Sequence, residues 1–186
     1  ITVSGSYYGG SVLIKSQNAR ILVITENASP YTVKNSLNEN YAAQPDAIIL
    51  LCNQEYTTKY GYDYDFECKD VYLSNLLFPA QPDSRLNFHY EHRFELYGVA
   101  FEFTDTHSLA FVCDGVSVAV CADENMRIKS CDLLISQKLN YDTENHSTIV
   151  DADKTVYFSQ KGYAYNVAEY GEMKFKTKDG RLSFAR

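Results

Sequence analysis

Short apolar runs separated by polar turns recur along the chain and predict a fold made mainly of strands. The runs Ser11–Ile14 and Arg20–Ile24 are joined by a turn-forming link, which predicts a hairpin. Gly9-Gly10 stands just before them and indicates a bend or a close approach of two backbones. The segment Asp46–Cys52 is apolar without interruption after its first residue, as expected for a strand buried on both faces.

One helix is expected between the opening hairpin and that buried strand. Ser29 suits the N-cap, and Pro30 suits the first helical position because its missing N–H is not needed there. Apolar residues then follow four apart and form one stripe: Val33, Leu37 and Tyr41. Gln44-Pro45 is expected to end the helix.

The segment from Tyr56 to Tyr72 has a different pattern, in which aromatic residues alternate with glycine and acidic residues. The aromatic positions are Tyr60, Tyr62, Tyr64 and Phe66. A period of two predicts an extended ribbon with an aromatic face packed on the core and an acidic face outside. The chain has 16 Tyr, 10 Phe and no Trp, and strands favour Tyr and Phe, so composition also favours a β-rich fold.

From Leu86 to Cys121 the pattern predicts a β meander. Asp114-Gly115 is a strong hairpin turn, which pairs Cys113 with Val116 and Ser108 with Cys121. In that register Cys113 and Cys121 lie too far apart for a disulfide. Further short strands are expected in three places: Asp70–Leu73, Asp132–Ser136 and Thr155–Phe158. The order predicts an α/β domain that is rich in strands and has two sheets.

A second Asp-Gly turn, Asp179-Gly180, predicts a closing hairpin with two different faces. Because side chains alternate along a strand, the apolar residues share one face and should pack on the core. The basic residues share the other face: Lys174, Lys176, Lys178 and Arg181. Such a face either keeps a solvated sheet edge from aggregating or makes weak, sequence-independent contacts with DNA phosphates.

Composition places the chain among ordinary globular proteins. It has 186 residues, of which 45% are hydrophobic and 22% charged, so we expect a single domain over residues 1–186. The longest apolar run is far shorter than the ~20 residues of a membrane span. The net charge of −7 argues against broad nucleic-acid binding, although a local basic stripe is compatible with it. The chain begins at Ile1, which we interpret as the start of a piece excised from a larger protein.

The chemistry-bearing residues form no recognised catalytic or metal motif. The four histidines, His89, His92, His107 and His146, lack HxH or HExxH spacing, and we interpret them as ordinary strand or surface residues. The five cysteines include no CxxC pair and are expected to be buried structural thiols. A catalytic Cys–His pair remains an alternative, because such partners can be far apart in sequence and meet only in the fold.

In this order, the elements resemble the C-terminal metallo-β-lactamase-like domain of ComEC-type competence proteins, a family of membrane channels for DNA uptake. Gly5–Ile14 and Arg20–Ile24 occupy the places of the family's opening turn and strands. Pro45–Thr57 matches the strand that leads into its HxHxDH motif, and Ser108–Asp123 matches a hairpin that ends in Gly-Asp. Cys131–Lys138 and Met173–Phe184 follow as later matches. The resemblance implies an αββα sandwich, here trimmed in helices.

The positions that hold zinc in that family carry other residues here. The HxHxDH positions fall on Cys52, Gln54, Tyr56 and Thr57, and a later pair of histidines falls near Gln137. Asp123 alone keeps the family's residue type, and zinc needs three or four ligands around one point. These residues are therefore interpreted as vestigial site positions without a metal or cofactor, and the aromatic rings after them are candidates to fill the former cleft.

The resemblance implies a non-catalytic domain of a DNA-uptake channel at the cell membrane, more on the extracytoplasmic side than the cytoplasmic one. Its role would be that of a scaffold or a weak guide for single- or double-stranded DNA, attached to a membrane-embedded parent chain. A hydrolase or nuclease with an unrecognised site is one alternative. A β-rich extracellular module for ligand binding or adhesion is another.

Overall fold

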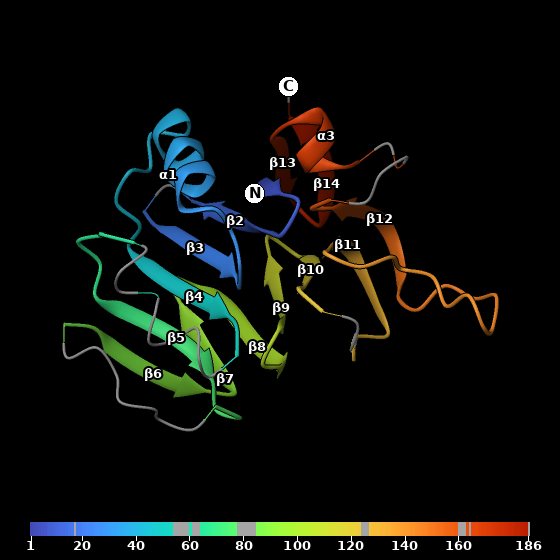
Figure 1. Cartoon of the computed structure of the whole chain (residues 1–186), viewed down its shortest axis with the longest axis horizontal. Coiled ribbons are helices and arrows are strands. Elements are labelled where there is room, and N and C mark those ends of the chain that lie inside the picture. The colour runs from blue at the N-terminus through green and yellow to red at the C-terminus, as the bar shows by residue number, and fades with distance from the viewer. Residues whose placement is uncertain are drawn as a thin grey trace.

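A computed structural model gives the structure of the chain and describes residues 1–16, 18–53, 60, 64–77, 85–123, 127–159, 163 and 165–185. Over these residues the strands form two sheets (Figure 1). One sheet has the order β14-β13-β1-β2-β3-β4-β5-β6, and the other has the order β12-β11-β10-β9-β8-β7. In the part of the chain described, no helix combines the length and apolar character needed to cross a membrane.

The first sheet is built from β1 (Thr2–Ser6), β2 (Gly9–Lys15), β3 (Arg20–Thr25), β4 (Ala47–Leu51), β5 (Asp70–Ser74), β6 (Asn87–Glu91), β13 (Met173–Lys178) and β14 (Arg181–Ala185). The second is built from β7 (Arg93–Leu96), β8 (Val99–Asp105), β9 (Ser108–Cys113), β10 (Val116–Cys121), β11 (Ser130–Ser136) and β12 (Asp151–Tyr157). Helices α1 (Pro30–Glu39) and α3 (Val167–Tyr170) accompany them.

Each sheet contains a run of parallel strands, whose carboxyl ends lie at the same edge of the sheet. Strands β3 to β6 are parallel in the first sheet, and β10 to β12 are parallel in the second. Every residue of β4 is buried, as its uninterrupted apolar sequence predicts for a strand covered on both faces. Parallel neighbours also end on the same edge of their sheet, so the residues that follow them are brought together.

Apolar side chains fill two main cores, one on each face of the first sheet. Alternate residues of β4 contribute to the two cores. Ile49 and Leu51 pack in the core between the two sheets, and Leu50 packs in the core on the side of α1, which we call the α1-side core. Val33 and Leu37 of α1 complete that core. The prediction of a strand-rich α/β sandwich with two sheets is therefore confirmed.

Both predicted Asp-Gly hairpins form with the expected registers. Cys113 pairs with Val116 across the first turn, and Lys178 pairs with Arg181 across the second. All five cysteines, Cys52, Cys68, Cys113, Cys121 and Cys131, carry free thiols.

The predicted close approach at Gly9-Gly10 is also confirmed. A Cβ on Gly10 would lie 2.3 Å from the Phe158 ring and 2.4 Å from the carbonyl oxygen of Ser4. A Cβ on Gly9 would lie 2.6 Å from the carbonyl oxygen of Glu26. Real Cβ contacts are essentially never that short, so the start of β2 requires glycine at both positions.

The expectation of an extended aromatic ribbon is wrong where the structure describes it. Tyr60 is helical, and the amide of Tyr64 donates to its carbonyl oxygen at 3.1 Å. Tyr64 and Phe66 lie outside any strand, although both are buried in the α1-side core. The Tyr60 and Tyr64 rings stack with their centroids 5.2 Å apart. Tyr62 lies outside the described residues.

The predicted stripe on α1 is right for Val33 and Leu37 and wrong for Tyr41. The helix ends at Glu39, and Tyr41 has a positive φ of 53° and is 88% exposed. The amide of Ala42 then donates to the carbonyl oxygen of Leu37 at 2.8 Å, which is the closing bond of a Schellman motif. Glycine usually takes the left-handed position of that motif. Because tyrosine takes it here, no local pattern predicts that the helix ends at Glu39.

Candidate functional site

Four parallel strands of the two sheets end near one another, and each is followed by a polar residue. Glu26 follows β3, and Asn53 comes soon after β4. Asp123 comes soon after β10, and Gln137 follows β11. Backbone bonds tie neighbouring ends together, because the amide of Glu26 donates to Leu51 at 2.8 Å and that of Gln137 donates to Cys121 at 2.9 Å. We call this region the strand-end edge.

The turn between β8 and β9 joins the two sheets at the strand-end edge. The amide of Cys52, in the first sheet's layer, donates to the carbonyl oxygen of Thr106 at 3.1 Å. The next residue, His107, accepts from the amide of Ala122 at 2.8 Å in the second sheet. Asp105 braces the turn, because its Oδ1 accepts from the amide of His107 at 2.7 Å. The imidazole of His107 is thereby held between the two sheets.

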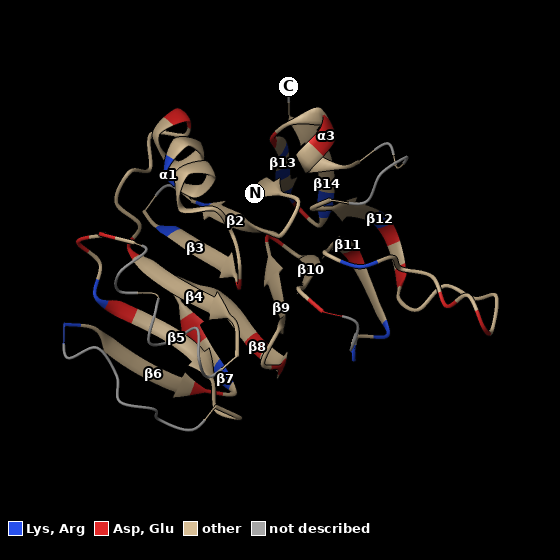
Figure 2. Ribbon diagram, viewed as in Figure 1, with Lys and Arg blue, Asp and Glu red and all other residues tan. Residues whose placement is uncertain are grey.

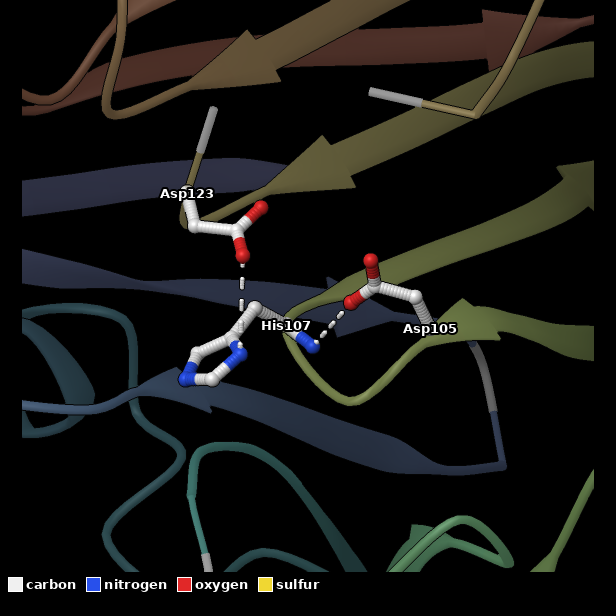
Figure 3. Close-up of side chains that lie close together, drawn as sticks. All are labelled: Asp105, His107 and Asp123. Carbon is white, nitrogen blue, oxygen red and sulfur yellow. Dashed lines mark hydrogen bonds and ion pairs between the residues drawn. The ribbon is translucent and has the colours of Figure 1, made fainter. Parts of the chain in front are cut away.

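The His107 ring lies between carboxylates that come from different sheets. Its Nε2 is 3.3 Å from Oε2 of Glu26, and its Nδ1 is 3.7 Å from Oδ2 of Asp123 (Figure 3). Nδ1 is also 2.9 Å from the hydroxyl of Thr106. Glu26 is fixed in turn by Asn53, whose amide and side-chain nitrogens donate to it at 2.8 and 2.9 Å. The ring is about three-quarters buried, with 23% of the side chain exposed, so these pairs are partly shielded from water.

Three residues of the strand-end edge could hold a cation together. One ligand atom each from Asp105, His107 and Asp123 lies within 4.8 Å of the others, and Asp105 is buried (Figure 3). Cys52, which the resemblance equates with a zinc ligand, does not fit such a role. Cys52 is fully buried in the α1-side core, and its burial raises the pKa of the thiol to about 12. A protonated thiol pointed into an apolar core is no zinc ligand.

The structure brings together only part of the predicted vestigial site. Cys52 and Asp123 reach the same edge, whereas Gln54, Tyr56 and Thr57 lie outside the described residues. The Gln137 amide donates to the hydroxyl of Ser159 at 2.9 Å and to the carbonyl oxygen of Tyr7 at 3.4 Å, so it links neighbouring turns.

Sequence reasoning missed the other members of the strand-end edge: Glu26, Asn53, Asp105 and His107. His107 had been interpreted as an ordinary histidine. One local signal existed, because Asp105 and His107 stand two apart in a tight turn between strands, where both side chains can face the same point. Nothing local connects them to Glu26 or Asp123, since those contacts cross between distant parts of the chain.

The predicted basic face of the closing hairpin is present. Lys176, Lys178 and Arg181 are exposed on β13 and β14, whose lysines and arginines are blue in Figure 2. Lys174 shares the face, and its ammonium lies 3.2 Å from Oε1 of Glu172. On the opposite face Phe175 is buried between the sheets as predicted, whereas Phe184, which was expected to pack there too, is 47% exposed. The hairpin therefore anchors a local positive strip on a chain whose net charge is −7.

An apolar trough of about 500 Å³ lies on the outer face of the second sheet. Small side chains line it, including Ala100, Ala110 and Ala119, and Val112 is 51% exposed there. The ion pair of Arg93 and Glu102 stands at its side, with a distance of 2.8 Å.

The chemistry available at the strand-end edge is that of one imidazole and three carboxylates. Such a group can move protons, form ion pairs or hold a cation. The lysine face offers instead a set of cations suited to phosphate. Comparison with known proteins does not assign the chain to a family: no model of a protein family matches the chain, and no curated protein matches its sequence.

Proposed function

We propose that the chain is a non-catalytic, metallo-β-lactamase-like domain of a ComEC-type DNA-uptake protein at the cell membrane, on its extracytoplasmic side. In this role it is a scaffold that also guides DNA weakly along its lysine face. The observation that carries the proposal is that Cys52 and Asp123 both lie at the strand-end edge of a two-sheet sandwich, on either side of the turn between β8 and β9. The resemblance places the family's reactive site at those two positions.

The absence of catalysis in this proposal rests on what the residues at these positions do. The Cys52 side chain fills an apolar core, and the Gln137 side chain links two turns. His107 and Glu26 join one sheet to the other, with Nε2 of the ring 3.3 Å from Oε2 of the carboxylate. Groups used in this way hold the strand-end edge together, which favours a scaffold.

The proposed DNA contact rests on the alternation of the closing hairpin. Lys176 and Lys178 of β13 lie on one face with Arg181 of β14, and all three are exposed. Neighbouring residues of one face are about 7 Å apart along a strand, which is close to the spacing of phosphates in a nucleic-acid strand. Glu172 neutralises part of the charge of Lys174, so about three cations remain for phosphate.

A DNA titration tests this proposal. The wild-type chain should bind single- or double-stranded DNA at low salt, with a salt slope of about −3. Changing Lys174, Lys176 and Lys178 to Ser together should abolish the binding. A control variant with Lys15, Lys34 and Lys129 changed to Ser loses the same charge from other surfaces and should keep most of it. Equal binding by the two triple variants, or no binding by the wild type, would contradict the DNA contact.

A hydrolase or nuclease is the second candidate, and the position of His107 favours it. An imidazole between two carboxylates is an arrangement that general acid–base catalysis uses. A nuclease assay that compares the wild type with His107→Gln decides between the two candidates. Activity that disappears in the variant, while the variant remains folded by circular dichroism, would replace the non-catalytic proposal.

A further inference from the structure

We propose that Asp105, His107 and Asp123 form a binding site for one divalent transition-metal cation of the Mn²⁺ and Zn²⁺ class. One nitrogen and two carboxylate ligands suit such ions, because imidazole and carboxylate are both among their usual donors. Asp105 ends β8 and His107 lies in the turn that follows it, and both stand outside the segments that carry the resemblance, whereas Asp123 ends one of those segments. The proposal does not depend on the proposed DNA contact.

The geometry of the three ligands supports a single ion. Their ligand atoms lie within 4.8 Å of one another. A metal ion with bonds of about 2.1 Å holds tetrahedral ligands about 3.4 Å apart, so side-chain rotations that close the widest pair by about 1.4 Å would bring all three into contact. The two aspartates supply two negative charges, which balance the charge of the ion. Asp105 is buried and its turn is braced by its own hydrogen bond, so one ligand is held in place beforehand.

A second and independent feature is the orientation of the His107 ring. A metal-binding histidine usually donates its other ring N–H to a carboxylate, which fixes the ring and leaves the remaining nitrogen free to bind. Here Nε2 faces Glu26 at 3.3 Å, so Nδ1, which faces Asp123, is the nitrogen with the lone pair. Asn53 holds Glu26 with two hydrogen bonds. Glu26 therefore acts as a positioning residue for the ring.

The hydroxyl of Thr106 is a further neighbour of Nδ1 of His107. It lies 2.9 Å from that nitrogen, and with the lone pair on Nδ1 it is the donor of the hydrogen bond between them. An arriving cation takes the lone pair, and the hydroxyl is then free to hydrogen-bond a water molecule on the ion. The same contacts would also exist if His107 were protonated and simply paired with both carboxylates. The two situations differ in whether the protein takes up metal.

Metal titration of the metal-free protein distinguishes a metal site from a histidine that is only hydrogen-bonded. After treatment with a chelator, Mn²⁺ uptake is followed by loss of the free-ion signal in electron paramagnetic resonance. Zn²⁺ uptake is followed by competition with a chromophoric chelator. We expect about one ion per chain for at least one of the two metals. Asp123→Asn and His107→Gln should each weaken binding by at least about tenfold.

Two further variants keep the test decisive. Glu26→Gln leaves all three ligands in place and should weaken binding by about 10- to 100-fold, because it disturbs only the ring's support. His89→Gln removes a histidine from another His–Asp pair, in which Nε2 lies 2.9 Å from Asp70, and should leave binding unchanged. The proposal is overturned if the wild type takes up neither metal at millimolar concentration. It is also overturned if Asp123→Asn binds as tightly as the wild type.

Discussion

The amide of Gly180 donates a hydrogen bond to the carbonyl oxygen of Asp114 at 2.8 Å, so the two Asp-Gly turns of the chain touch each other. The turns belong to different sheets, because Asp114 lies between β9 and β10 and Gly180 lies between β13 and β14. The hydroxyl of Thr177 adds a second bond, to Oδ2 of Asp114, at 2.8 Å. The sandwich is thus joined at these turns as well as at the strand-end edge.

Replacing Gly115 by Ala should weaken this contact between the turns. Gly115 has φ +79°, and a Cβ there would lie 3.2 Å from Cα of Gly180. We expect a loss of about 2 kcal/mol in the free energy of unfolding, part from backbone strain and part from crowding. Gly98→Ala is the matched control, since its φ is +80° and a Cβ would meet nothing within 4 Å. It should lose about 1 kcal/mol. Urea unfolding of both variants measures the difference, and equal losses would contradict the crowding.

The aromatic stack beside α1 should be important for stability. Phe66 is 5% exposed and stacks on Tyr64 with ring centroids 5.6 Å apart. Phe66→Ala should lower the free energy of unfolding by about 3 kcal/mol, because it leaves a cavity in the core. Tyr64→Phe should lose about 1 kcal/mol, since the Tyr64 hydroxyl donates to the carbonyl oxygen of Ala28 at 3.2 Å. Tyr31→Ala, at a side chain that is 76% exposed, should change stability by less than about 0.5 kcal/mol.

The buried cysteines should resist alkylation in the folded protein. Burial raises the pKa of both Cys52 and Cys121 to about 12. At pH 8 only about one in ten thousand of these thiols would be ionised, and the thiolate is the reactive form. After iodoacetamide treatment, mass spectrometry should find Cys52 and Cys121 unmodified and the half-exposed Cys113 labelled. Labelling of Cys52 at the same rate as Cys113 would show that the α1-side core opens readily.

The ion pair of Arg20 and Asp46 should contribute to stability at neutral pH and lose its effect in acid. Hydrogen bonds from the Arg20 side chain, opposed in part by desolvation, hold the pKa of Asp46 below its usual value. A carboxylate whose pKa is lower in the folded state stabilises the fold above its unfolded pKa of about 3.9. That contribution disappears as the pH falls through the folded pKa.

Urea unfolding of Asp46→Asn measures this contribution. The side chain is 29% exposed, so the variant should lose only about 0.5 to 1 kcal/mol at pH 7. The gap between variant and wild type should close on acidification below about pH 4. A gap that stays constant down to pH 2 would mean that the charge of Asp46 is not its source.

The sequence by itself determined the local elements whose signals are carried by adjacent residues. The Asp-Gly turns gave both hairpin registers, because a two-residue turn leaves only one way to pair the flanking strands. The apolar run of β4 indicated a strand covered on both faces. The Ser29 cap and Pro30 marked where α1 begins. The end of α1 and the conformation of Tyr60 were predicted wrongly, because a left-handed Tyr41 and a helical Tyr60 leave no local pattern.

Tertiary structure alone decided the candidate site. Glu26 and Asp123 come after parallel strands of the two stacked sheets that end at a common edge, and the turn between antiparallel β8 and β9 places His107 between them. Periodicity reports which face of an element is buried, but it carries no information on which strand ends will be neighbours. That choice depends on how the two sheets pack over one shared core, which is a property of the whole chain.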